Sequence, residues 1–281
     1  MKNLTLVCLF VSGLFPMLGH SALAAQPSFK RVMIVIFENA KYTDALKQTY
    51  FGKIATQGAL FTQFIAEAHP SQPNYVALVS GSTQGVRSDS PVNLDANHIG
   101  NLLEQKNLSW KVYAEDLPNN CFLSATKGRY ARKHVPFYSF TNVQNDASEC
   151  AKIVNATDLS KDISTHSVPA FSLYIPNLDN DGHDTGAKYA SEWFETAFSP
   201  IFSNSDFMKD TLVIATFDES DDYFSTNQIY TVFLGANVIP GSTVSTVTTH
   251  YSILRTIEDV FEIGTLGLND SSTSAISGIW Q

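Results

Sequence analysis

Short apolar runs alternate with amphipathic stretches along most of the chain. Residues 31–37 read RVMIVIF, a continuous apolar run of the kind that forms a strand buried on both faces of a sheet. Similar runs predict strands at residues 110–113, 170–175, 211–217 and 230–234, and helical patterns fall at residues 74–79, 98–104, 187–198 and 252–261. This alternation predicts an α/β domain with a mainly parallel central sheet flanked by helices.

The first 25 residues have the pattern of a secretory signal peptide. Lys2 precedes a mostly apolar run over residues 4–18, and the segment Ala22-Leu23-Ala24-Ala25 supplies small residues for cleavage. The apolar run is too short for a membrane span, and no later segment is long enough; an uncleaved N-terminal anchor is the alternative. We therefore expect a secreted or periplasmic protein, with no integral membrane association, whose one domain covers residues 26–281.

Charge and cysteine content narrow the class of protein further. The formal net charge is −9, so the chain has no general field that attracts nucleic acid, and we expect no such partner. Cys8 lies in the signal segment, which leaves Cys121 and Cys150 for a disulfide in an exported protein. A catalytic thiol is the alternative, although neither cysteine has a local motif. Residues 116–164, rich in turn formers, predict a long insertion over one sheet edge, pinned by this disulfide.

Three of the predicted strands are followed directly by polar clusters. These clusters are Glu38-Asn39, residues 176–184 and residues 218–222. The carboxyl ends of parallel strands share one edge of a sheet, so we expect the clusters to meet there. Converging carboxylates repel one another unless a cation lies between them. Hard oxygen donors from Glu38, Asn39, Asp218 and Glu219 suit magnesium, calcium or manganese, with zinc also possible.

Two simpler explanations of the acidic clusters remain. Acidic residues favour loops in general, without any site. The segment from Asn177 to Gly182 also resembles the start of an EF-hand calcium loop, but Lys188 stands where that loop needs glutamate, so we set the calcium-loop interpretation aside.

Ser71 is the candidate nucleophile, within the segment HPSQPNY. Pro70 precedes it directly and Pro73 suits the first turn of a helix, which would place Ser71 beside free amide groups that attract phosphate. A hydroxyl at that place is activated by a nearby cation, or it simply caps the helix. The roles of His183 and His250 are open in the same way. Each is either a surface histidine or one whose hydrogen bonds are satisfied within the protein; alternatively, the pair contacts phosphate and protonates a leaving group.

The order of five motifs resembles the bacterial phosphoesterase family of secreted acid phosphatases and phospholipases C. The motifs are IFENAKY, HPSQPNYVALVSG, YIPNLDNDGHD, ATFDESD and THYSILRTIED, spread from Glu38 to about Asp259. That family is similar to the broader alkaline phosphatase superfamily, so the resemblance implies an alkaline phosphatase-like fold. It also implies that Ser71 becomes phosphorylated during turnover.

The resemblance implies roles for further residues. One divalent ion would be bound by Glu38, Asn39, Ser71, Asp218 and Glu219; two-zinc relatives usually have histidine in place of Glu219, which argues against a zinc pair. The spacing Ser-x-Pro-Asn resembles the Thr-x-Pro-Asn of nucleotide pyrophosphatases, and Asp179 with His183 resembles their Asp-x-x-Gly-His metal motif. The substrate-binding side chains would then be His69, Asn74, Asp179, His183 and His250.

The function these features predict is that of a metal-dependent acid phosphatase acting on phosphate monoesters, phosphoinositides or other lipid phosphates included. A phospholipase C-like phosphodiesterase is the alternative enzyme, and a secreted calcium-binding or adhesion module is the alternative outside enzymes. If imidazolium groups contact phosphate, activity falls as pH rises through about 6–7. A basic run of Arg129, Arg132, Lys133 and His134 in the insertion is interpreted as a solvated surface, with contact to an anionic substrate as the alternative.

Overall fold

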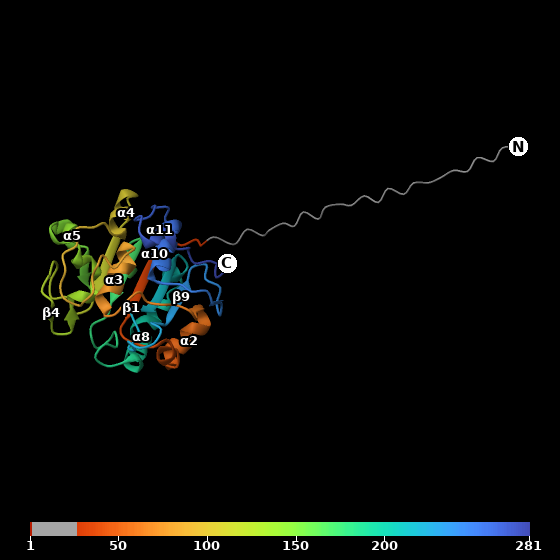
Figure 1. The fold of residues 1–281 in the computed structure, drawn as a ribbon, viewed down its shortest axis with the longest axis horizontal. Coiled ribbons are helices and arrows are strands. Elements are labelled where there is room, and N and C mark those ends of the chain that lie inside the picture. Colours follow the sequence, from red (N-terminus) through yellow and green to blue (C-terminus); the bar gives the residue numbers. More distant parts are fainter. Residues whose placement is uncertain (2–26) are drawn as a thin grey trace.

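The computed structural model describes Met1 and residues 27–281, so the predicted signal peptide and Cys8 lie outside the described residues. Its centre is an eight-stranded sheet with the order β10-β2-β9-β8-β1-β7-β3-β6 (Figure 1). The strands are β1 (Arg31–Phe37), β2 (Ala59–Phe61), β3 (Trp110–Ala114), β6 (Ile153–Asn155), β7 (Phe171–Ile175), β8 (Thr211–Phe217), β9 (Thr231–Gly235) and β10 (Thr243–Val244). A separate hairpin joins β4 (Thr126–Lys127) and β5 (Tyr130–Ala131).

The middle of the sheet is parallel, as the apolar runs predict. Strand β1 pairs in parallel with β8 on one side and with β7 on the other, and β3 and β6 continue the parallel order. Strand β9 runs antiparallel to β8. No helix separates these two strands, and a parallel return would need a crossover of a dozen or more residues, usually helical. The apolar pattern alone cannot indicate this reversal.

Helices cover the sheet in two groups, with the sheet between them (Figure 1). One group packs α2 and α1 against α8, and the other packs α3 against α10. The helices are α1 (Tyr42–Leu46), α2 (Thr49–Gln57), α3 (Ser71–Ser80), α4 (Ile99–Gln105), α5 (Thr141–Gln144), α6 (Ala147–Cys150), α7 (Asp158–Ser164), α8 (Ala187–Phe202), α9 (Ser205–Met208), α10 (His250–Val260) and α11 (Asn269–Ser272), with 3-10 turns η1 (Arg132–His134) and η2 (Pro136–Ser139). Within the described residues, no helix is long and apolar enough to cross a membrane.

The core explains why β1 is apolar throughout. Every residue from Val32 to Phe37 is at most 1% exposed, because helices lie on both faces of the strand. At the carboxyl end, the ring of Phe37 packs edge-on against Phe51 of α2 and Phe194 of α8, each 5.0 Å between centroids. Such aromatic contacts add about 0.5–1.5 kcal/mol each beyond the burial of area. They hold the end of β1, and so the next residue along the chain, in a rigid setting.

The insertion is part of the domain rather than a cover over its edge. It contributes the edge strand β6 of the main sheet, and it brings η1 and η2 against α3. Cys121 and Cys150 form the predicted disulfide, with their Cα atoms 5.2 Å apart and a sequence separation of 29. Closing a loop of this length is worth about 3–4 kcal/mol in the chain-entropy account.

Candidate active site

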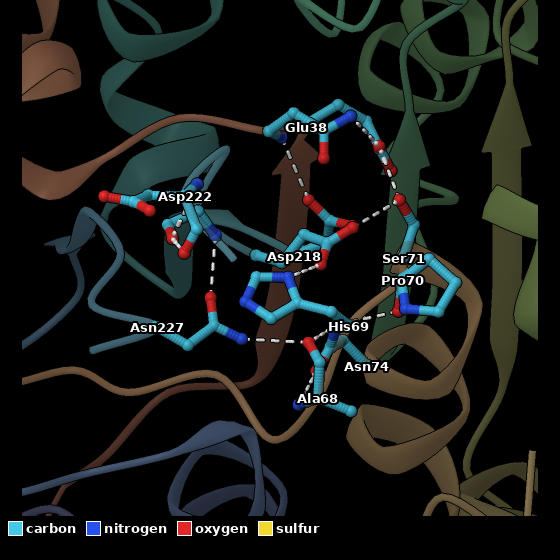
Figure 2. A network of polar contacts seen from close by, with 12 residues as sticks. Glu38, Ala68, His69, Pro70, Ser71, Asn74, Asp218, Asp222 and Asn227 are labelled. Atoms are coloured by element: carbon cyan, nitrogen blue, oxygen red, sulfur yellow. Dashed lines mark hydrogen bonds and ion pairs between the residues drawn. The ribbon is translucent and has the colours of Figure 1, made fainter. Parts of the chain in front are cut away.

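Ser71 is the first residue of α3, with Pro70 as the residue that precedes the helix. The side chain is 2% exposed, and its hydroxyl lies 3.0 Å from Oε2 of Glu38 and 3.1 Å from Oε1 of Glu219, to either of which it can donate (Figure 2). Pro70 has no side chain that caps the amino end of α3, and the Gln72 amide donates to Asp89 over 3.0 Å. Ser71 is therefore directed at two carboxyl groups from distant parts of the chain, and not at the amides of its own helix.

The acids come from the ends of two neighbouring parallel strands. Glu38 follows β1, Asp218 and Glu219 follow β8, and all three are at most 1% exposed. Asn39 has a positive φ of 53°, a conformation that asparagine adopts more readily than most residues. Its amide N–H donates to Oδ1 of Asp218 over 3.2 Å, and its side-chain nitrogen donates to Oε2 of Glu38 over 3.2 Å. The structure thus brings the predicted acids and Ser71 to one edge of the sheet.

Burial sets the electrostatics of these acids. It raises the pKa of Glu38 to about 8, with repulsion from Asp218 adding to the effect. Burial raises the pKa of Glu219 to about 8 as well, and it holds the pKa of Asp218 well above its usual value. Three carboxyl groups that resist ionisation together need either protons or a cation, since a lone buried carboxylate is costly.

His134 lies between two buried acids, and the sequence did not single it out. Its Nε2 is 3.0 Å from Oε1 of Glu38, and its Nδ1 is 3.2 Å from Oδ2 of Asp181. The ring stacks on Tyr75, with 5.1 Å between centroids and 10° between planes, and the Tyr75 hydroxyl donates to Oε1 of Glu38 over 2.6 Å. Burial lowers the pKa of His134 to about 4, although Glu38 opposes this, so the imidazole is neutral near pH 7.

Lys133 carries a positive charge beside the same acids. Its ammonium group lies 2.8 Å from Oδ2 of Asp89 and 3.5 Å from Nε2 of His183. Burial by itself lowers the pKa of Lys133, but Glu38 and Asp89 more than compensate and the pKa is raised. Lys133 therefore remains an ammonium ion at acidic and neutral pH.

The interpretation of the basic run as a solvated surface is therefore wrong for most of it. Arg132 and His134 are 7% and 1% exposed, and only Arg129 is exposed. A surface run and a buried run have the same charge pattern in the sequence. Whether these basic residues are buried depends on how the insertion packs on α3.

The structure buries Asp181 beside His134, whereas the sequence motif singles out Asp179. Asp179 pairs with Arg129 over 3.0 Å at the surface, whereas Asp181 is 0% exposed and faces His134. Burial raises the pKa of Asp181 to about 8. The carboxylate of Asp179 is thus paired with Arg129, and its contact with substrate stays a prediction. His183 lies 3.5 Å from the ammonium group of Lys133, and its contact with phosphate stays a prediction.

Asn74 and His250 also differ from their predicted role as substrate contacts. Asn74 is 1% exposed; it accepts from the Ala68 amide over 2.9 Å and donates back to the Ala68 carbonyl over 2.8 Å. It therefore shapes the loop before Ser71. His250 is also 1% exposed, with Nδ1 2.5 Å from Oε2 of Glu67 and Nε2 3.1 Å from the Phe217 carbonyl. Both of its nitrogens have partners in the protein, so it braces the end of β8.

His69 lies at the site, as predicted. Its Nδ1 contacts Oε2 of Glu219, and its ring stacks on Tyr223, with 4.2 Å between centroids and 25° between planes (Figure 2 shows His69 near Asp218). Tyr223 is 58% exposed. The exposed side of the site is thus bordered by an aromatic stack over Glu219.

The donor set fits a hard divalent cation. Among the described residues, Oδ2 of Asp218 is one of the few buried side-chain oxygens with no hydrogen-bond partner, as is Oδ2 of Asp181. The predicted ligands Glu38, Asn39, Ser71, Asp218 and Glu219 present oxygen atoms, which suit magnesium, calcium or manganese. In this part of the chain no three His, Cys, Asp or Glu side chains are already arranged as a metal-ligand group. The carboxyl groups of Glu38 and Glu219 instead form hydrogen bonds with Ser71, Tyr75 and His69.

Solved structures share the fold of this chain. The chain aligns with a protein of the alkaline phosphatase superfamily from Vibrio parahaemolyticus with a TM-score of 0.59 and 12% identity, covering 89% of this chain and 72% of the other. The lipoteichoic acid synthase LtaP from Listeria monocytogenes gives a TM-score of 0.57 at 10% identity, over 85% and 75% of the two chains. The fold is therefore that of the alkaline phosphatase superfamily.

Sequence similarity places the chain more narrowly. The profile of the Phosphoesterase family matches residues 40–264. The chain is 35% identical over 273 residues to a phosphatidylinositol-3-phosphatase of Mycobacterium tuberculosis, covering 95% of this chain and 88% of that protein. It is 34% identical over 262 residues to a probable acid phosphatase of Kluyveromyces lactis, over 89% of this chain and 62% of that one. The chain spans about three fifths of the length of the fungal acid phosphatases that it matches. This protein belongs to the Phosphoesterase family.

Proposed function

We propose that this chain is a secreted or periplasmic, metal-dependent acid phosphatase that hydrolyses phosphate monoesters through a phosphoserine formed on Ser71. The observation that carries this proposal is the Ser71 hydroxyl, buried at the start of α3 and directed at carboxyl groups from β1 and β8. Relatives over most of the chain are an acid phosphatase and a phosphatidylinositol-3-phosphatase by name, which supports a phosphate ester as substrate.

In the first step, the chain's own residues accept the proton of the nucleophile and stabilise the charge on the phosphoryl group. Oε1 of Glu219, 3.1 Å from the hydroxyl, accepts the proton as the Ser71 oxygen forms its bond to phosphorus. The bond from phosphorus to the alcohol oxygen breaks, and that oxygen takes up a proton from solvent water. The positive end of α3 and the ammonium group of Lys133 stabilise the charge on the phosphoryl oxygens. Water then cleaves the phosphoserine, which releases phosphate and restores the hydroxyl.

A divalent ion bound by Glu38, Asn39, Ser71, Asp218 and Glu219 would lower the pKa of the Ser71 hydroxyl and neutralise part of the phosphate charge. The raised pKa values of Glu38 and Glu219 support this assignment, because binding a cation is one way in which these buried acids ionise together at neutral pH.

The test is a substrate panel on the chain without its first 25 residues. Nitrophenyl phosphate, a phosphoinositide and bis-nitrophenyl phosphate are assayed with Mg²⁺, Ca²⁺, Mn²⁺ or Zn²⁺ added after chelation. We expect nitrophenyl phosphate to be hydrolysed at least tenfold faster than the diester and the Ser71→Ala variant to retain less than about 1% of activity. A phosphoserine trapped by acid quench should map to Ser71.

A matched control is Ser172→Ala, which removes another buried hydroxyl, one that donates to the Val32 carbonyl within the sheet. Faster turnover of the diester would indicate a phospholipase C-like enzyme instead. Calcium binding without turnover of any ester would indicate a binding module, and activity in Ser71→Ala would contradict the proposed nucleophile.

A further inference from the structure

A cavity of about 220 Å³ opens beside the nucleophile, between the insertion and the start of α3. Its lining includes Gln72, the residue after Ser71, and Lys133, the residue before His134. His183 completes this side of the cavity. An alcohol or phenol attached to a phosphate at Ser71 therefore has an enclosed space next to it.

The two sides of the cavity differ in chemistry. On the side of Ser71, Asp89 accepts the Gln72 amide over 3.0 Å and pairs with Lys133 over 2.8 Å. The remaining wall is largely apolar: Pro91, Ala125, Ala131 and Leu178 contribute to it, and the polar residues in it are Thr126, Arg132 and Ser139. A ligand that fits this arrangement has a charged end at Ser71 and an apolar body.

The most polar group of the wall is already engaged. The guanidinium of Arg132 donates to the carbonyls of Leu123 and Tyr138, each over 2.8 Å, and to that of Val92 over 3.1 Å. A ring bearing many hydroxyl groups would lose hydrogen bonds to water here and gain few in return, which costs affinity. An apolar ring loses nothing of this kind.

The volume limits the size of the occupant. An apolar cavity of about 150 Å³ holds benzene, whereas pockets for drug-sized ligands begin at about 300 Å³. A cavity of about 220 Å³ therefore takes one ring with a small substituent. It does not take a diacylglycerol or a nucleoside with its base and sugar.

We propose that this cavity binds the leaving group of the substrate, and that the preferred substrates are phosphate monoesters of compact alcohols or phenols that carry an apolar ring. The inference rests on the proposed phosphatase activity at Ser71. The bond from phosphorus to the ester oxygen breaks as Ser71 attacks, the freed oxygen takes a proton, and the ring stays in the cavity until the alcohol leaves.

The test compares three esters of aliphatic alcohols, whose leaving oxygens are similar in reactivity. These are benzyl phosphate, inositol 1-phosphate and ethyl phosphate. We expect kcat/KM for benzyl phosphate to exceed that for inositol phosphate by about tenfold or more. An equal or higher value for inositol phosphate would overturn the assignment and indicate a polyol-binding site.

Variants of exposed alanines make the test independent of overall damage. Ala125→Trp fills the cavity from its rim and should lower kcat/KM for benzyl phosphate about tenfold, with less than a twofold change for ethyl phosphate. Ala147→Trp, on an exposed alanine of the insertion that does not line the cavity, should change neither. Equal losses for both esters in Ala125→Trp would overturn the proposal.

Failure of the proposed activity remains distinguishable from failure of this inference. If the wild-type protein hydrolyses none of the esters, the phosphatase proposal fails. Calorimetry with benzylphosphonate, which has no ester bond to cleave, then still decides whether the cavity binds an apolar ring. Binding to wild type that is weakened about tenfold in Ala125→Trp would support the cavity, and equal binding by both proteins would refute it.

Discussion

The Tyr75 hydroxyl donates a 2.6 Å hydrogen bond to Oε1 of Glu38. Tyr75 stands one helical turn after Ser71 on α3, and Ser71 contacts the other oxygen of the same carboxyl group. One turn of α3 therefore orients both oxygens of Glu38, which links the position of the nucleophile to the position of a predicted metal ligand.

We expect Tyr75→Phe to lower kcat/KM about tenfold, because one hydrogen bond to a carboxyl group is worth about 1.5 kcal/mol. The fold should be unchanged, as shown by circular dichroism. The control is Tyr174→Phe, which removes a 3.0 Å hydrogen bond to Glu115, outside the site. Equal kinetic effects of the two variants would mean that Tyr75 acts only through stability.

Lys133 should act mainly in binding the phosphate. Lys133→Met removes the ammonium group near His183 and should raise KM about tenfold with a smaller change in kcat. Lys152→Met is the matched control, because Lys152 is also partly buried and pairs with Glu104 and Glu149, away from Ser71. An unchanged KM in Lys133→Met would place the phosphate elsewhere.

Metal binding should be visible without any assay of activity. After chelation, added divalent ion at roughly 100 times its Kd should raise Tm by about 5–10 °C, since binding to the folded state adds about 2.7 kcal/mol. Asp218→Asn should abolish most of this shift, because Asp218 supplies a buried oxygen without a hydrogen-bond partner in the described structure. The same shift in both proteins would contradict Asp218 as a ligand.

The stack of Tyr223 on His69 should help to hold the imidazole against Glu219. Tyr223→Ala should lower kcat/KM about three- to tenfold, the range that corresponds to one aromatic contact, and Tyr223→Phe should restore it because the ring suffices. Phe224→Ala changes the neighbouring side chain, which is 99% exposed, and should have no effect. If Phe fails to restore activity, the hydroxyl and not the stack is what matters.

A buried acid pair outside the site should make stability depend on pH. Glu258 and Asp270 are 1% and 0% exposed, and burial together with Asp270 raises the pKa of Glu258 from 4.5 to about 9. The folded value exceeds the unfolded one, so this stabilisation is complete below pH 4.5 and is lost as pH rises toward about 9.

Thermal denaturation between pH 5 and pH 9 checks this expectation. Tm of Glu258→Gln should fall less than that of wild type over this range, whereas Glu262→Gln, on an exposed glutamate, should track wild type. Comparing the variants isolates Glu258 from the acids near Ser71, whose pKa values are raised as well. Parallel curves for all three proteins would refute the role of Glu258.

Much of the site could be predicted because it lies at the ends of strands. The run RVMIVIF and the run before Asp218 are apolar for one reason, burial on both faces, and parallel strands bring the residues after their carboxyl ends to one edge of the sheet. Glu38 and Asp218 were therefore identified from local pattern, and Ser71 from its motif together with the family resemblance. The disulfide between Cys121 and Cys150 could be predicted because they are the two cysteines outside the predicted signal peptide.

The residues that the sequence missed depend on contacts between distant segments. His134 looked like one member of a charged surface run, and it became buried because η1 packs on α3. Asp181 and Asp179 belong to one loop with similar neighbours, and only the direction of the backbone distinguishes the acid that faces His134 from the acid that pairs with Arg129.

By itself, the sequence determined the alternation of strands and helices, the parallel core of the sheet, the edge at which the acids gather and the identity of the candidate nucleophile. These features arise from burial and from residue patterns within a few turns of chain. Only the tertiary structure decided the reversal of β9, the inward turn of His134 and the use of Asn74 and His250 as braces. Those outcomes depend on hydrogen bonds and packing between segments as far apart as Ser71 and Glu219, 148 residues along the chain, which no local pattern encodes.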